Sequence, residues 1–219
     1  MTEFAESAES NLEPRLPVYD AIRRRRDVRA EFTGKPIAEN VLERILGAGH
    51  SAPSVGNTQP WDFVVVRDPA TLHSFADHVA DARLRFAQSL PEERKKTFDA
   101  IKIEGIRESG MGVVVTYDRG RGGQHILGRH TIDDTGLFSV VLAIQNLWLA
   151  AVAENVGIGW VSFYDESYLT ELLKIPEPVR PIAWLCVGDV AEFQQVPDLE
   201  RFGWRGRRPL ADAIHFEKF

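Results

Sequence analysis

The sequence predicts an α+β sandwich, in which helices pack on a sheet, rather than a doubly wound parallel sheet. Strand-like and helix-like segments alternate irregularly along the chain, whereas a doubly wound fold alternates them regularly. One segment at residues 137–152 is apolar nearly all round, which indicates a helix buried in the core or in a subunit interface, and we favour both at once. With 219 residues and 44% hydrophobic content, the chain can bury a core of ordinary size.

Each predicted element has a local signal. A helix begins at Pro17, where Val18, Ala21 and Ile22 share one face, and it runs into a group of arginines. A second predicted helix ends at Gly49 or close to it. This second helix covers residues 36–49, and a strand at 63–66 and a charged helical excursion at 71–107 follow it. Three further strands are predicted at 111–117, 157–163 and 181–187, and the apolar helix lies between the first two of these. The chain ends in an extended C-terminal arm at 197–219.

The chain as a whole predicts one domain over residues 17–219, preceded by a flexible segment at 1–16. That first segment is polar and acidic and lacks the cationic and apolar regions of a signal peptide, so we expect a cytoplasmic protein. The net charge of −6 argues against nucleic-acid binding. The apolar helix contains polar residues and is short for a bilayer, so we expect no membrane span.

A cationic cluster is the first candidate functional feature. Residues 25–29 read Arg-Arg-Asp-Val-Arg and follow two further arginines. Guanidinium groups suit phosphate, and Arg25 and Arg29 would share one face if the preceding helix continued through them. We expect the surrounding positive charge to hold the carboxylate of Asp27 ionised. The alternative is that these arginines only complement the dipole at the end of the helix.

The loop at residues 52–61 is the second candidate feature. Its glycine and prolines permit or impose unusual backbone angles, so the polar groups of Ser54, Asn57 and Gln59 could converge on a planar heterocycle. A plain loop of turn-forming residues is the alternative. Cations for a phosphate and amides for a ring edge are together what a bound flavin mononucleotide (FMN) requires. Arg205 and the arginines after it could add charge, although a solvated surface is the stronger interpretation of them.

Other chemistries lack support in the sequence. Gly157 and Gly159 imitate the start of a dinucleotide fingerprint, but they precede a strand where the fingerprint follows one. We therefore predict no separate nicotinamide-binding domain. No Walker loop or Gly-x-Ser-x-Gly elbow occurs, and the six histidines are scattered, so we expect no metal site. Cys186 lies in an apolar run and is predicted to be a buried, inert thiol.

These two candidate features resemble the flavin-site signatures of the nitroreductase superfamily. Many members have Arg-Arg-Ser-x-Arg at the first feature, whereas this chain has Asp27 at the serine position. It shares that aspartate with the BluB subgroup, whose members are 5,6-dimethylbenzimidazole synthases, and Ser162 lies in a segment that also resembles them. Further similar segments lie at residues 102–107, 145–151 and 203–205, so the resemblance extends from about Val18 to about Asp212.

The resemblance implies a nitroreductase-like sandwich whose central sheet is mostly antiparallel, and a homodimer with FMN at the subunit interface. It also implies a reaction in which reduced FMN is a substrate. Dioxygen and reduced FMN would give 5,6-dimethylbenzimidazole, the lower ligand of vitamin B12, and erythrose 4-phosphate. Asp27 and Ser162 would be catalytic. The implied cofactor-binding residues are Arg25, Arg26, Asp27, Val28, Arg29, Ser54, Asn57, Gln59, Gly159 and Arg205.

Under this interpretation the helical excursion at 71–107 would act as a lid that excludes water, and a separate reductase would supply reduced flavin. Two other functions stay open from the sequence. One is a conventional NAD(P)H-dependent nitroreductase or flavin oxidoreductase, in which the flavin survives turnover. The other is a flavin-binding protein without catalysis, in which Asp27 is only a structural partner of arginines.

Overall fold

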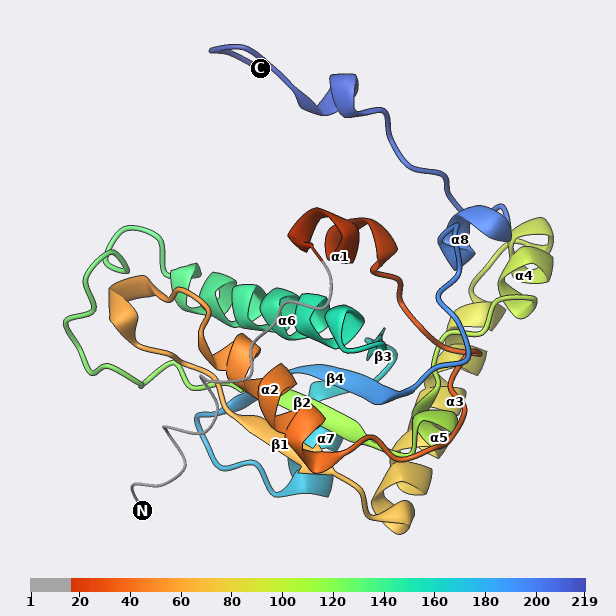
Figure 1. Cartoon of the computed structure of the whole chain (residues 1–219), viewed down its shortest axis with the longest axis horizontal. Coiled ribbons are helices and arrows are strands. Elements are labelled where there is room, and N and C mark those ends of the chain that lie inside the picture. Colours follow the sequence, from red (N-terminus) through yellow and green to blue (C-terminus); the bar gives the residue numbers. More distant parts are fainter. Residues whose placement is uncertain (1–16) are drawn as a thin grey trace.

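The computed structural model describes residues 17–219, so the segment predicted to be flexible, 1–16, lies outside the described residues. The elements follow one another as shown in Figure 1. They are α1 (Val18–Arg24), α2 (Glu39–His50), the short 3₁₀ helix η2 (Val55–Asn57), β1 (Phe63–Val66), α3 (Pro69–Gln88), α4 (Glu92–Asp99), α5 (Ile106–Ser109), β2 (Gly112–Tyr117), α6 (Thr135–Ala153), β3 (Val156–Val161), α7 (Glu166–Leu173), β4 (Arg180–Asp189), α8 (Asp198–Arg201) and η3 (Leu210–Ala213).

The four strands form one antiparallel sheet in the order β1-β2-β4-β3. Val113 of β2 pairs with Leu185 of β4, and Gly159 of β3 pairs with Cys186 on the other side of β4. Because side chains alternate along a strand, each strand sends its residues to both faces of the sheet. The prediction of an α+β sandwich with a mostly antiparallel sheet is confirmed.

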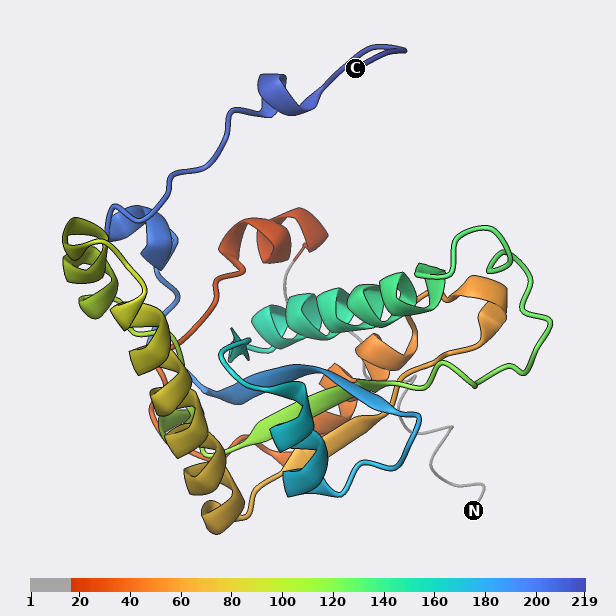
Figure 2. The same cartoon turned by 180° about the vertical axis from the view of Figure 1, so that it is seen from behind.

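Two hydrophobic clusters, one on each face, hold helices to the sheet. On one face α2 and α6 pack against alternate residues of β2 and β4 such as Val113 and Leu185. On the other face α3 and α7 pack around Trp184, whose ring stacks on Phe75 at 3.9 Å between centroids. Figures 1 and 2 show α6 and α7 on opposite sides of the sheet. The sheet is therefore covered on both faces.

Helix α6 is apolar enough and long enough to cross a membrane, yet half of its most apolar 18-residue window is buried in this structure. Ala143, Ile144 and Leu147 of this helix are almost completely buried. The prediction of a buried core helix is confirmed for this side of α6. Its other side leaves Phe138, Val141 and Leu142 exposed.

The first helix is shorter than the sequence pattern indicated. It ends at Arg24, and Arg25 already has extended backbone angles, so Arg25 and Arg29 do not share a helical face. The reason is tertiary: the N–H of Val28 donates to the carbonyl of Ile158 at 2.9 Å, which pairs this segment with β3. Pairing with β3 thus replaces the helical hydrogen bonds that the pattern predicted.

The C-terminal part of the chain leaves the body of the molecule. Beyond α8 it passes η3 and projects outward, as both views show. Leu210, Phe216 and Phe219 are exposed on it. The expectation of an extended arm is confirmed in form.

Candidate functional site

The candidate site forms where residues 27–28 run beside β3. A methyl group on Gly159 would lie 2.1 Å from the carbonyl oxygen of Val28, so only glycine allows the two backbones to approach this closely. Val28 itself is buried in the core. Gly159 and Val28 therefore place Asp27 next to Trp160, the following residue of β3.

Both carboxylate oxygens of Asp27 have partners. Its Oδ1 accepts a hydrogen bond from the backbone N–H of Trp160 at 2.8 Å, and its Oδ2 accepts from the guanidinium of Arg29. The side chain is still 31% exposed, so a ligand can reach it. This arrangement holds the carboxylate in one orientation and leaves a path for protons.

The arginines that were expected to hold Asp27 ionised do not set the direction of its pKa shift. Burial raises the pKa of Asp27 above its usual value, and this effect outweighs the opposing influence of Arg29, of the Trp160 N–H and of Arg25. Several neighbours in sequence are occupied elsewhere: Arg23 pairs with Asp20, and Arg26 donates to backbone carbonyls, including that of Arg25 at 2.7 Å. Arg23 and Arg26 are therefore close to Asp27 in the sequence but do not pair with its carboxylate.

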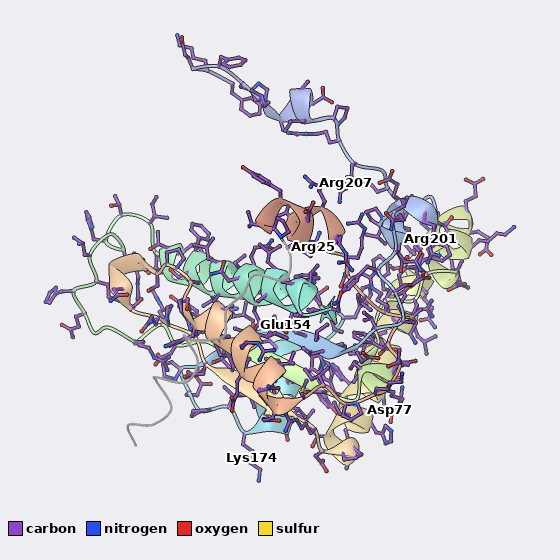
Figure 3. The ribbon with its side chains drawn as sticks, in the orientation of Figure 1. Arg25, Asp77, Glu154, Lys174, Arg201 and Arg207 are labelled. Atoms are coloured by element: carbon purple, nitrogen blue, oxygen red, sulfur yellow. The ribbon has the colours of Figure 1, made fainter. Side chains whose placement is uncertain are left out.

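A pocket of about 120 Å³, called the cationic pocket after its arginines, lies on one side of Asp27. It is lined by residues 25–29, by Glu31 and by Asp198 with its neighbours in 194–199. The guanidinium of Arg25 lies over the Trp148 ring at 4.8 Å and, among residues 17–219, forms no ion pair. Burial lowers the pKa of Arg25, and the nearby charge of Arg207 lowers it further. Figure 3 places Arg207 near Arg25. Three carboxylates face the three arginines of this pocket, so the guanidinium of Arg25, which has no ion pair among the described residues, is the charge that an anion would balance.

A second, largely aromatic pocket of about 270 Å³ adjoins the first. Ser162 lies at its wall, one residue beyond the end of β3, and is exposed. The two pockets share Arg29 and Leu199. The other lining residues are Phe86, Phe98, Ile101, Ile103, Trp160, Phe163 and Trp204. The structure therefore brings Asp27 and Ser162, the two predicted catalytic residues, to the two sides of one boundary.

Helices α3 and α4 supply part of the wall of this aromatic pocket. Phe86 and Phe98 contact each other with ring centroids 5.0 Å apart, and Phe98 lies 6.0 Å from Trp204 of the C-terminal segment. Arg94 of α4 lies over the Trp204 ring at 3.7 Å and donates to the Trp204 carbonyl at 3.2 Å. The predicted helical excursion thus forms part of the pocket wall, and Arg94 links it to Trp204, which lies just after α8.

The loop with Ser54, Asn57 and Gln59 is not brought to this place. Ser54 Oγ accepts from the backbone N–H of Gln59 at 2.9 Å, and Asn57 and Gln59 both have positive φ, which is a strained conformation for these residues. The loop is anchored at the first half of α6, where the N–H of Val55 donates to Ser139 Oγ at 3.0 Å.

The arginine segment, by contrast, is anchored at the second half of α6. There the indole N–H of Trp148 donates to the Arg26 carbonyl at 3.2 Å. Ser139 and Trp148 lie about two and a half turns apart, or about 13 Å along the helix axis. Within one chain the two predicted flavin-site features are therefore separate.

Arg205, also predicted to bind the ligand, is exposed, and Arg207 rather than Arg205 acts electrostatically on Arg25 and Arg26. Sequence reasoning missed Asp198, which is buried at the start of α8 and pairs with Arg29 and Arg201. It also missed Trp204 as a pocket residue. Trp204 lies in the segment 203–205 that resembles the family, which was its one signal, whereas the buried aspartate could be found only from its partners in space.

Within residues 17–219 no group of three or more His, Cys, Asp or Glu side chains could hold a metal ion, so the prediction of no metal site stays a prediction. Cys186 is fully buried in the sheet. Burial raises the pKa of its thiol to about 12, which makes it unreactive as predicted.

Comparison with known proteins gives one family and several relatives. The model of the nitroreductase family matches residues 22–189. A 5,6-dimethylbenzimidazole synthase from Rhodospirillum rubrum is 41% identical over 185 residues, which cover 84% of this chain and 87% of the relative. A protein of the same name from Rhodobacter capsulatus is 36% identical over 191 residues, which cover 87% of this chain and 91% of the relative.

Among solved structures, an oxidised iodotyrosine deiodinase bound to FMN and 3-iodo-L-tyrosine superposes with a TM-score of 0.73. The match covers 93% of this chain and 100% of that chain at 20% identity. At this identity the likeness shows the fold alone, and the two ligands belong to that protein.

Proposed function

The chain belongs to the nitroreductase family, and we propose that it converts reduced FMN and dioxygen to 5,6-dimethylbenzimidazole and erythrose 4-phosphate, with the pyrimidine part of the flavin ring released as a further, oxidised fragment. The two synthase relatives described above support the product, since each matches more than four fifths of the chain. One structural observation carries the proposal furthest: Asp27, with a raised pKa, lines the cationic pocket and pairs with Arg29, which also lines the adjoining aromatic pocket that holds Ser162. A flavin phosphate suits the first pocket and a flavin ring suits the second.

The residues of the cationic pocket fit the phosphate of FMN. Arg25 has no ion pair among the described residues, and the Nε of Arg26 is buried without a hydrogen-bond partner there. Arg207 lies close enough to lower the pKa of both. Because like charges repel, this cluster is costly until an anion binds, and a phosphate dianion would relieve it.

The aromatic pocket fits a flavin ring and a reaction that must exclude water. Bound reduced FMN would supply both the electrons for dioxygen and the carbon atoms of the product. The rings of Phe98, Phe163 and Trp204 give an apolar wall, and Arg94 holds Trp204 in place. The role of these residues is to keep the pocket dry while the ligand reacts.

Asp27 and Ser162 would move protons to and from the bound flavin. The raised pKa of Asp27 makes it a better base than an ordinary aspartate, because it holds a proton more firmly once it has taken one. The Trp160 N–H and Arg29 each hold one of its oxygens, so the carboxylate keeps one orientation and exchanges a proton through a remaining lone pair. Ser162 can both donate and accept a hydrogen bond, which suits it to orient or relay a proton.

We further propose that the functional unit is a homodimer. The cavities of about 120 and 270 Å³ are each smaller than typical small-molecule pockets of roughly 300–1,000 Å³. The loop with Ser54 and Asn57 lies too far along α6 to complete them within one chain. A second copy related by a two-fold axis would bring its own loop to the site.

Exposed apolar side chains support such a contact. Val18, Tyr19 and Ile22 of α1 and Phe138 and Leu142 of α6 are exposed, and α1 packs beside α6. Exposed apolar residues that lie together on neighbouring helices mark an interaction surface. Since reduced FMN must reach the site from elsewhere, we also propose a separate flavin reductase as its source, and the cytoplasm as the location.

The proposal is tested by supplying the electrons chemically. The protein is loaded with FMN, reduced without NAD(P)H under anaerobic conditions, exposed to air and analysed by chromatography and mass spectrometry. We expect dimethylbenzimidazole to appear in proportion to the flavin lost. Intact oxidised FMN with peroxide would overturn the proposal. Rapid reduction of the bound flavin by NAD(P)H, with flavin surviving turnover, would instead indicate a conventional nitroreductase.

A further inference from the structure

We infer that Asp198 is a positioning residue of the proposed reaction: its carboxylate holds the guanidinium of Arg29 at the boundary of the two pockets and so controls how Asp27 exchanges its proton. The kinetic part of this inference rests on the proposed function. The electrostatic part rests on geometry alone. The two parts are therefore tested separately below.

Asp198 connects α8 to the Asp27 segment. Its side chain is only 6% exposed. Arg201, one turn later, donates to Asp198 Oδ1 at 2.7 Å, while Asp198 Oδ2 lies 3.9 Å from Nη1 of Arg29. Arg29 uses its other terminal nitrogen, Nη2, on Asp27. The four side chains thus form a row of alternating charge: Asp27, Arg29, Asp198 and Arg201.

The orientation of Arg29 depends on the two carboxylates. The guanidinium is 12% exposed, and its Nε is buried with no hydrogen-bond partner in the described part of the chain. Nη2 therefore donates to Asp27, while Nη1 has a longer charge–charge contact with Asp198, at 3.9 Å. If the carboxylate of Asp198 is lost, Arg29 keeps a single anionic partner, which is Asp27.

A role limited to α8 would not need this arrangement. Arg201 already pairs with Asp198 from within the same short helix, and Arg201 is 43% exposed. Burying a carboxylate is costly unless its charge is balanced, and one half-exposed partner balances it poorly. Asp198 is instead placed between two arginines, one of which lines both pockets.

The charged groups around Asp27 fix the expected sign. Arg25 and Arg29 face it from its own segment, the Trp160 N–H from β3, and Asp198 from α8. Glu31 also lines the cationic pocket, and Arg207 acts on Arg25. Of these groups Asp198 is the negative charge that acts on Asp27. Removing it leaves Arg29 wholly to Asp27, which favours the ionised carboxylate and makes it a weaker base.

The test uses Asp198→Asn, which keeps the shape of the side chain and removes its charge, in the full-length protein. The matched control is Asp77→Asn, because Asp77 forms an exposed ion pair with Arg107 and lies far from Arg201, as Figure 3 shows. The first readout is the titration of the Asp27 carboxyl carbon by ¹³C NMR without flavin, assigned by its loss in Asp27→Asn. The second is the pH profile of FMN consumption in a single turnover.

We expect Asp198→Asn to move the Asp27 midpoint to lower pH by about 0.5 or more, as loss of a charge at this range implies. The Asp27-dependent limb of the single-turnover profile should move in the same direction, with the maximum rate falling about tenfold. Asp198→Glu, which restores the charge, should return the midpoint toward the wild-type value. Asp77→Asn should change neither readout.

An unchanged Asp27 midpoint in folded Asp198→Asn overturns the inference. If circular dichroism shows that Asp198→Asn is unfolded, the decision passes to Asp198→Glu and Arg201→Ala. A folded Arg201→Ala should raise the Asp27 midpoint, because Asp198 then loses its second cation. No movement in that variant also overturns the inference. Failure of the wild-type protein to form dimethylbenzimidazole removes the proposed function, while the NMR titration still decides the role of Asp198.

Discussion

At the scale of single residues, Asp27 is governed by competition between burial and nearby charge. The ion pair with Arg29 and the Trp160 N–H both favour the carboxylate, yet burial prevails and raises its pKa. Such a group is costly to ionise in the folded protein and costs little in the unfolded chain, where water surrounds it. A carboxylate with a raised pKa does not help stability when it ionises, and such groups are typical of functional sites.

Replacing Asp27 by Asn tests this directly. Because the fold raises the pKa of Asp27, its ionisation reduces the free energy of unfolding as pH rises from about 3.9, the pKa of unfolded aspartate, through the folded pKa. Asparagine has no such titration. The free energy of unfolding of Asp27→Asn relative to wild type should therefore increase across that interval, while FMN consumption falls about a hundredfold or more.

Urea titrations at several pH values measure the difference, with Asp20→Asn as control because Asp20 forms an exposed pair with Arg23. A difference that stays constant with pH, or that decreases, contradicts the raised pKa.

At the scale of elements, β3 determines the geometry of the site. Two of its glycines allow other segments to approach: a methyl group on Gly157 would meet Val190 at 2.2 Å, and one on Gly159 would meet the Val28 carbonyl at 2.1 Å. The strand ends at Val161, so Ser162 follows directly and lines the pocket. One strand thus positions both predicted catalytic residues.

Gly159→Ala should separate the Asp27 segment from β3, since a backbone oxygen cannot move aside as a flexible side chain can. We expect a loss of about 1–3 kcal/mol in the free energy of unfolding and a marked loss of FMN affinity. Gly47→Ala is the matched control: it lies in α2 with nothing within 4 Å of an added methyl group, and alanine there should stabilise by roughly 0.5–1 kcal/mol. Thermal unfolding and FMN titration measure both effects. Equal stability and equal FMN affinity of the two variants would refute the role of Gly159.

The sequence predicted the strands and the buried helix well because these elements have strong local periodicity. It failed at Arg25, where pairing with β3 ends a helix that the local pattern would continue. It brought out Asp27 and Ser162, but not Asp198, because a single aspartate after a proline has no local signature. The direction of the Asp27 pKa shift was also mispredicted, since burial is a property of the fold and not of neighbouring residues.

At the scale of the whole molecule, the two predicted flavin-site features lie at different ends of α6, and the C-terminal arm extends away from the body. Within a single chain, therefore, the loop with Asn57 does not reach the cationic pocket. This separation is accounted for if the proposed site takes its parts from two copies of the chain.

Mixing two inactive variants tests this sharing. Asp27→Asn and a loop variant such as Asn57→Ala would each be impaired alone, but a mixed dimer would contain one site with both parts intact. After subunit exchange, random pairing makes half of the dimers mixed, so about a quarter of wild-type activity should return. If each site were built from one chain, exchange would restore nothing. Mixing Asp27→Asn with Ser162→Ala is the control, because both residues line the same chain's boundary.

The cationic pocket affects the release of the product as well as the binding of FMN. In the proposed reaction the phosphate leaves on a four-carbon sugar, and Arg25, Arg26 and Arg207 meet the same dianion that they met on FMN. The same cations that bind the phosphate of FMN would therefore also bind the sugar phosphate and slow its release. Steady turnover would accordingly be limited by product inhibition, and inorganic phosphate in the buffer would slow the enzyme by occupying the pocket.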